Sequence, residues 1–208
     1  MAATLGGTFL RYNLTIGLYL ASLGAGSLLC SRAAPGALAE TLADVELALA
    51  ALGALRPLLV HGWDAAAFPA VTRLGLEFRG PVHQAAVYGF DYGLILAVGV
   101  LSGFELPLLM RLAGEERRNE VLAVDYAGTL AGALLFAFVL LPGPGALTTA
   151  ILAGMLNAFC GLYVAVAVSR RPGLGRLAAA GGVVLFTALL FACRERLHEA
   201  VFESFRLF

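Results

Sequence analysis

The fold of this chain is decided by a long apolar run, AAVYGFDYGLILAVGVLSGFELPLLM, at residues 85–110. A helix needs about 20 mostly apolar residues to cross a bilayer, and this run exceeds that length. Similar apolar stretches occur at residues 8–30, 38–60, 121–141, 147–168 and 177–193. The sequence therefore predicts an all-α transmembrane bundle of about six membrane-spanning helices, forming a single domain over residues 1–208.

The overall composition also indicates a membrane protein. Hydrophobic residues make up 60% of the 208 residues and charged residues 13%, whereas a soluble domain has about 25% charged residues. The fourteen basic residues, all arginine, balance fourteen acids, so no excess of positive charge indicates nucleic-acid binding. The lipid bilayer is the first partner that this composition predicts.

Three of the apolar runs contain a carboxylate, at Glu46, Glu105 and Asp125. A charge inside a membrane helix is costly and is kept when something pairs with it. Helices that alternate in direction would bring these acids to one leaflet, with Tyr126 beside them and Asn157 deeper. We interpret the five residues as a candidate site for a cation, such as a polyamine. The alternative is internal pairing of the acids with arginines of the same face: Arg111, Arg117 and Arg118.

Two connecting segments have a mixed character. Residues 61–84 combine Trp63 and other apolar residues with polar ones, which suits a segment at the membrane interface. Residues 194–208 alternate charge with large apolar residues, which predicts a short amphipathic helix against the membrane surface or a partner. Near the end of the apolar run at residues 38–60, Arg56 is expected to extend toward the interface. Asp91 either forms the second end of a path or pairs with Arg56.

Small residues recur at the spacing that lets membrane helices approach closely. The pairs are Gly99 and Gly103, Gly128 and Gly132, and Gly154 and Ala158. They predict compact helix packing and say little about function.

No cofactor is predicted. His61 and His83 end one predicted helix and begin the next, so together they could ligate a haem iron. Both lie at the membrane edge and no second pair occurs, which makes haem an unfavoured interpretation. Cys30, Cys160 and Cys193 show no metal-binding spacing, and we interpret them as small buried hydrophobic residues.

Several stretches, taken in order, resemble the membrane half of bacterial membrane-associated spermidine synthases, which are polyamine aminopropyltransferases. They are LTIGLYLASLGAGS at 14–27, DVE at 44–46, GFELPLL at 103–109, DYAG at 125–128, LLP at 140–142 and GMLNA at 154–158. The resemblance implies a multi-pass protein of the bacterial cytoplasmic membrane. It carries over Glu105, Pro107, Asp125, Tyr126 and Asn157 as positions of the family pattern.

The resemblance also has two departures. Members of that family have one more helix ahead of the first one here and a catalytic nucleotide-binding domain after the last. Neither has a counterpart in residues 1–208, so we expect no enzymatic activity from this chain. The favoured hypothesis is a non-catalytic membrane module that anchors or associates with partner proteins. The alternatives are a module that binds or transports a polyamine or other cation, and an accessory structural subunit of a large respiratory or photosynthetic complex.

Overall fold

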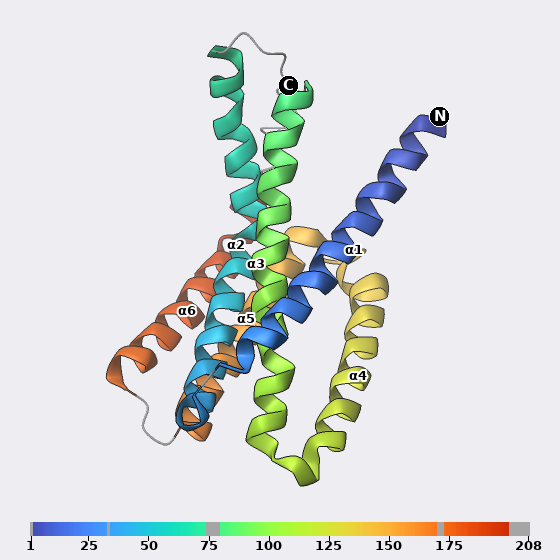
Figure 1. Cartoon of the computed structure of the whole chain (residues 1–208). Coiled ribbons are helices and arrows are strands. Elements are labelled where there is room, and N and C mark those ends of the chain that lie inside the picture. The colour runs from blue at the N-terminus through green and yellow to red at the C-terminus, as the bar shows by residue number, and fades with distance from the viewer. Residues whose placement is uncertain (1, 33, 74–79, 170–172, 200–208) are drawn as a thin grey trace.

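The computed structural model describes residues 2–32, 34–73, 80–169 and 173–199, and every regular element in them is helical. The all-α prediction is confirmed. The six long helices are α1 (Ala2–Cys30), α2 (Leu38–Arg73), α3 (Pro81–Ala113), α4 (Arg118–Leu135), α5 (Gly145–Tyr163) and α6 (Leu174–Ala192) (Figure 1). Four short helical segments complete the order: η1 (Pro35–Ala37), η2 (Glu115–Arg117), and the π-helical η3 (Phe136–Leu140) and η4 (Val164–Val168). Residues 194–199 are also helical.

Five of these helical stretches are long and apolar enough to cross a membrane. They are Phe9–Cys30, Pro81–Ala113, Glu115–Leu140, Gly145–Val168 and Leu174–Ala192. The remaining long helix, α2, carries charged side chains along its whole length, and it is not among the five. α2 packs against α3, α5 and α6, and it buries an apolar face that includes Leu42, Ala50 and Ala54. α2 is therefore the central helix of the bundle.

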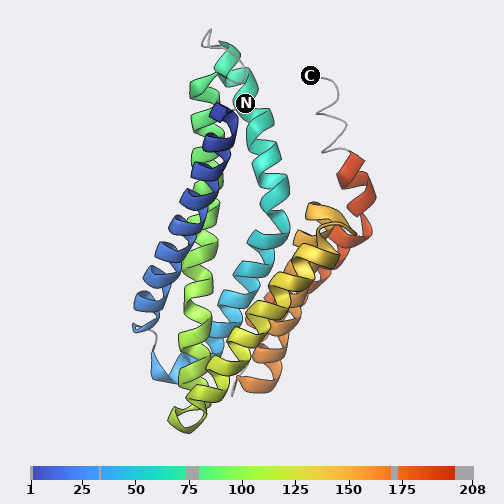
Figure 2. The same ribbon diagram turned by 90° about the vertical axis from the view of Figure 1, so that its right-hand side faces the viewer.

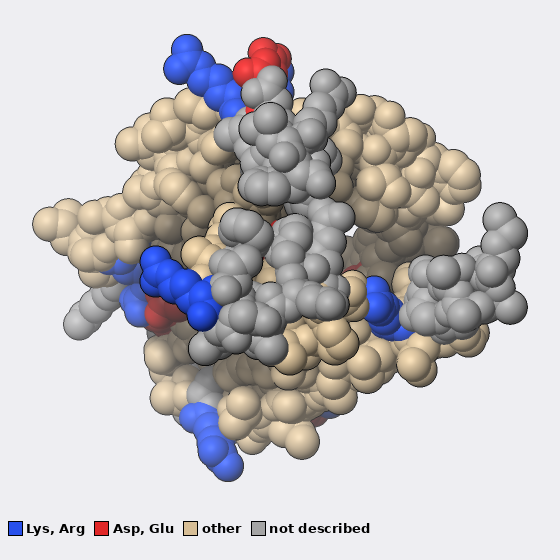
Figure 3. Space-filling view, turned by 90° about the horizontal axis from the view of Figure 1, so that it is seen from above, with Lys and Arg blue, Asp and Glu red and all other residues tan. Residues whose placement is uncertain are grey.

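The helices form two groups around α2. Figure 2 shows α1 and α3 on one side and α4, α5 and α6 on the other. Figure 3 views the end of the bundle where α1 begins, and its charged side chains lie there in small separate groups among uncharged atoms. In this view, the described residues show no broad charged surface at that end.

Most of the connection predicted at residues 61–84 is helical, so the predicted helix ends at residues 60 and 85 were wrong. α2 continues to Arg73 and α3 begins at Pro81; part of the segment, residues 74–79, lies outside the described residues. The reason is packing between the two helix ends. The Trp63 ring stacks on Phe90 with 4.8 Å between centroids, and its Nε1 donates a hydrogen bond to the Ala86 carbonyl. These contacts hold the end of α2 against the start of α3.

Close helix packing is confirmed for two of the three predicted small-residue pairs. A Cβ atom at Gly103 would lie 2.2 Å from the Leu23 carbonyl oxygen, so α1 and α3 touch through their backbones. Gly154 is also close to α2, where its Cβ would lie 2.8 Å from the Ala50 carbonyl oxygen, and Ala158 is buried.

The third predicted pair behaves differently. Neither Gly128 nor Gly132 of α4 has a described atom of another helix within 4 Å of the position of a Cβ. The packing prediction was therefore wrong there. α4 leans away from the bundle (Figure 1), and each of its residues is at least partly exposed. The helix leaves α3 through Gly114, whose φ of +82° favours glycine.

Candidate functional site

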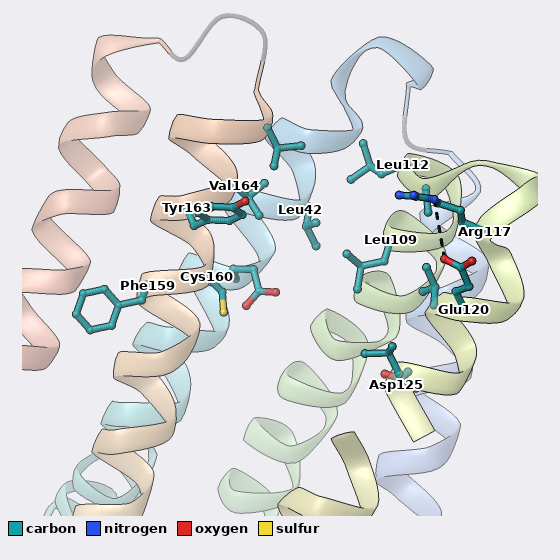
Figure 4. Close-up of a pocket in the computed structure, with 15 residues that line it drawn as sticks. Leu42, Leu109, Leu112, Arg117, Glu120, Asp125, Phe159, Cys160, Tyr163 and Val164 are labelled. Atoms are coloured by element: carbon teal, nitrogen blue, oxygen red, sulfur yellow. Dashed lines mark ion pairs between the residues drawn. The ribbon is translucent and has the colours of Figure 1, made fainter. Parts of the chain in front are cut away.

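A groove of about 890 Å³ lies between α3 and α4 on one side and α2 and α5 on the other (Figure 4). Its lining is mostly apolar and includes leucine, valine, phenylalanine and tyrosine side chains. Four charged residues also line it: Glu46, Arg117, Glu120 and Asp125. A lipid-filled gap would need no such charges, because charged groups in a bilayer are rare and mark polar sites or paths.

The helical repeat places the charges of α4 on one face. Groove residues recur at every third or fourth position from η2 into α4, at Arg117, Glu120, Val121, Val124 and Asp125, which is the spacing of a single helix stripe. Glu46 reaches the groove from α2 four residues after Leu42, so these two also share one helix face.

The three predicted carboxylates are brought together. Glu46 and Asp125 line the groove from different helices, and Glu105 lies behind it, close enough for its charge to interact with both. Each is seven or eight residues from the nearest end of its helix. At a rise of 1.5 Å per residue, the carboxylates lie about 10–12 Å from these helix ends. Their common depth is what the alternating helix direction predicts.

The arginines of the same end have other partners. The Arg117 Nε lies 3.9 Å from a Glu120 carboxylate oxygen, and an Arg118 Nη2 lies 3.6 Å from Glu115. Arg111 donates a hydrogen bond to the Cys30 carbonyl oxygen over 3.1 Å. Across the described part of the chain, no ion pair joins an arginine to Glu46, Glu105 or Asp125. Arg117 and Arg118 thus pair with Glu120 and Glu115 rather than with these three acids.

Two of the predicted site residues lie away from the groove. Tyr126 is 68% exposed on α4 and does not line it. Asn157 is half-buried on α5 and is also absent from the lining. The reason is helical geometry: neighbouring positions on a helix point about 100° apart, so the residue next to a groove residue can face elsewhere. Proximity in sequence to Asp125 was a poor guide for Tyr126.

The groove includes residues that the sequence interpretation missed. Glu120 was not singled out, although its three-residue spacing from Arg117 indicated a shared helix face. Cys160 was interpreted as a buried hydrophobic residue, but it is exposed and lines the groove; Cys30 is buried as predicted and Cys193 is intermediate. Glu46 and Glu105 lie near enough to Cys160 for their charges to act on it.

The opposite end of α2 and α3 contains paired charges. Arg56 Nη2 lies 2.7 Å from Asp91 Oδ1, so of the two alternatives for Asp91 the structure has the ion pair. The Arg56 guanidinium therefore points toward α3, and not only toward the membrane interface. His83 Nε2 lies 3.2 Å from Asp64 Oδ1, which directs this ring nitrogen to a carboxylate. No group of three or more metal-ligating side chains occurs within the described ranges.

Comparison with known proteins finds polyamine aminopropyltransferases that are similar to this chain. Polyamine aminopropyltransferase 2 of Streptomyces coelicolor is 33% identical over 181 residues, which cover 80% of this chain and 30% of that protein. Polyamine aminopropyltransferase 2 of Aquifex aeolicus is 32% identical over 205 residues, which cover 95% of this chain and 36% of that protein. This chain is homologous to the N-terminal part of the polyamine aminopropyltransferases.

The homology confirms the resemblance found in the motifs, and it has a limited extent. A relative from Ralstonia nicotianae, also a polyamine aminopropyltransferase 2, is 34% identical over 159 residues and is covered to 28% of its length. The chain thus spans about a third of the length of the polyamine aminopropyltransferases that it matches. No family model and no solved structure matches it.

Proposed function

We propose that this chain is a non-catalytic membrane module of the bacterial cytoplasmic membrane that binds a polyamine in the groove between α2, α3, α4 and α5. The single observation that carries the proposal is a pair of carboxylates, Glu46 and Asp125, that line an apolar groove and form no ion pair with any arginine that the structure describes. Glu105 adds a third carboxyl group, close enough to interact with both.

The chemistry of a polyamine suits such a groove. Its ammonium groups compensate carboxylates that would otherwise lie uncompensated in a medium of low dielectric. Its methylene chain can lie against leucine and valine side chains. The relatives of this chain are named polyamine aminopropyltransferases, which supports the ligand class. A monovalent metal ion would use the carboxylates and leave the apolar lining without a role.

The non-catalytic part of the proposal concerns residues 1–208 themselves. The aligned region is the N-terminal third of enzymes of this name, and the sequence contains no glycine-rich nucleotide loop of the kind that a nucleotide-derived substrate requires. The module would then hold or present a polyamine while chemistry takes place elsewhere.

Association with a partner protein is the second candidate, and α4 is the observation that favours it. This helix leaves Gly128, Gly132 and large apolar side chains such as Leu130 exposed. Small residues on a membrane helix are a common contact for another helix. Lipid covers an apolar face equally well, however, whereas it does not satisfy Glu46 and Asp125. We therefore favour the groove. Nothing in the described residues favours a respiratory or photosynthetic complex over other partners.

Amine binding to the purified chain tests the proposal. The full chain is placed in phosphatidylcholine nanodiscs and titrated with 1,4-diaminobutane by isothermal calorimetry. Glu46→Gln and Asp125→Asn should each weaken binding by about tenfold or more, since a hydrogen bond to a charged group contributes about 1.5–3 kcal/mol. Glu116→Gln, which removes an exposed acid outside the groove, should leave the affinity unchanged. Equal affinities for all four proteins would refute a site in the groove.

A further inference from the structure

The mouth of the groove contains an ion pair that the proposed cation site must accommodate. Arg117 and Glu120 both line the groove and lie 3.9 Å apart, as the dashed line in Figure 4 shows. Both side chains are 74% exposed. A fixed positive charge at this position would repel an entering ammonium group, and it would also occupy the outermost carboxylate of the groove.

The geometry of α4 puts Glu120 at a useful distance from the deeper acid. Glu120 and Asp125 are five residues apart and lie at opposite edges of the groove face of α4, about 7.5 Å apart along the helix axis and about 140° apart around it. Val121 and Val124 lie between them on the groove face. The two nitrogens of an extended four-carbon diamine are about 6 Å apart, given C–C and C–N bonds near 1.5 Å. The order of groups in the groove is carboxylate, apolar surface, carboxylate, and it is complementary to a linear diamine.

We propose that Arg117 is a tethered cation that holds Glu120 until a linear diamine displaces it. One ammonium group then binds Glu120 and the other binds Asp125 and Glu46. This inference rests on the proposed function and deepens it, since it assigns Glu120 and Arg117 as the residues that set specificity for diamines over monoamines. A monoamine fills the inner position only and leaves the Arg117–Glu120 pair in place.

The strengths of neighbouring ion pairs support displacement at this position. Arg176 donates two hydrogen bonds, of 2.8 and 3.0 Å, to the Asp44 carboxylate. This bidentate geometry is the strong form of an arginine–carboxylate pair. Arg117 makes a single long contact with Glu120. Exposed pairs of this kind contribute about fivefold or less to an equilibrium. A diamine held at its inner end can therefore compete for Glu120.

The test compares butylamine with 1,4-diaminobutane on the full chain in phosphatidylcholine nanodiscs. Glu120→Gln should weaken diamine binding by about fivefold and leave butylamine unchanged, because only the outer position is lost. Arg117→Gln should tighten diamine binding by about threefold, because the competitor is removed. The matched controls are Glu115→Gln and Arg118→Gln, which disrupt the neighbouring ion pair outside the groove and should change neither affinity. Circular dichroism confirms that each variant is folded.

The outcomes separate this inference from the proposed function. If the wild-type chain binds 1,4-diaminobutane, Asp125→Asn abolishes that binding and the Glu120 and Arg117 variants behave like the controls, the inference is overturned and the proposed function stands. If the wild-type chain binds neither amine, both fail. A diamine preference that disappears in Glu120→Gln supports both.

Discussion

At the scale of the residue, Arg56 and Asp91 illustrate how a charge is kept within a membrane bundle. They lie on α2 and α3 and meet at 2.7 Å. Arg56→Gln or Asp91→Asn should each lower the free energy of unfolding by about 1–3 kcal/mol, because the remaining charge loses its partner. The double variant should lose less than the sum of the two single variants by about 0.5–3 kcal/mol. Denaturant titration in mixed micelles measures these differences.

An exposed ion pair provides the control for that cycle. Arg194 and Glu195 lie 3.4 Å apart, with the Glu195 side chain 83% exposed, so Glu195→Gln should change the free energy of unfolding by less than about 1 kcal/mol. Strict additivity of Arg56→Gln and Asp91→Asn would show that the pair contributes no coupling energy.

At the scale of the element, α1 and α3 depend on glycines for their contact. Gly103→Ala would place a Cβ 2.2 Å from the Leu23 carbonyl oxygen, and this forces the two backbones apart. We expect a loss of about 1–3 kcal/mol in the free energy of unfolding, the usual cost of overpacking. Gly128→Ala on α4 is the matched control, because it meets open space; it should be neutral or stabilise its helix by up to about 1 kcal/mol. Equal effects of the two changes would contradict the packing described for α1 and α3.

At the scale of the whole molecule, the groove should admit water-borne cations. Cys160 lines it, near the charges of Glu46 and Glu105, whereas Cys30 is fully buried. In a Cys193→Ser background, a cationic methanethiosulfonate should modify Cys160 about tenfold faster than an anionic one of similar size, because the acids attract the cation. Intact mass spectrometry follows the reaction. Glu46→Gln should reduce this ratio, and 1,4-diaminobutane should protect Cys160.

Two results would argue against an open, acidic groove. One is equal modification rates for the two reagents. The other is modification that persists after Cys160→Ala, which would place the reactive thiol elsewhere.

Much of the fold could be predicted because the length and apolarity of a segment are local properties. The run at residues 85–110 and its counterparts marked all six long helices, since a bilayer requires each spanning backbone to satisfy its own hydrogen bonds. The end of α2 could not be predicted in this way. Residues 61–73, which mix polar and apolar side chains, are helical because Trp63 and Asp64 contact α3. A local sequence pattern does not reveal such contacts.

The candidate site likewise has features that the sequence predicts and features that it does not. The sequence by itself determined that Glu46, Glu105 and Asp125 lie inside apolar helices at similar depths, because position along a helix follows from residue number. Only the tertiary structure decided that Glu46 and Asp125 share a groove, that Tyr126 faces away from it and that Arg117 pairs with Glu120 at its mouth. These features depend on which helix faces meet and on how far α4 leans from the bundle, and both are set by contacts between segments distant in the chain.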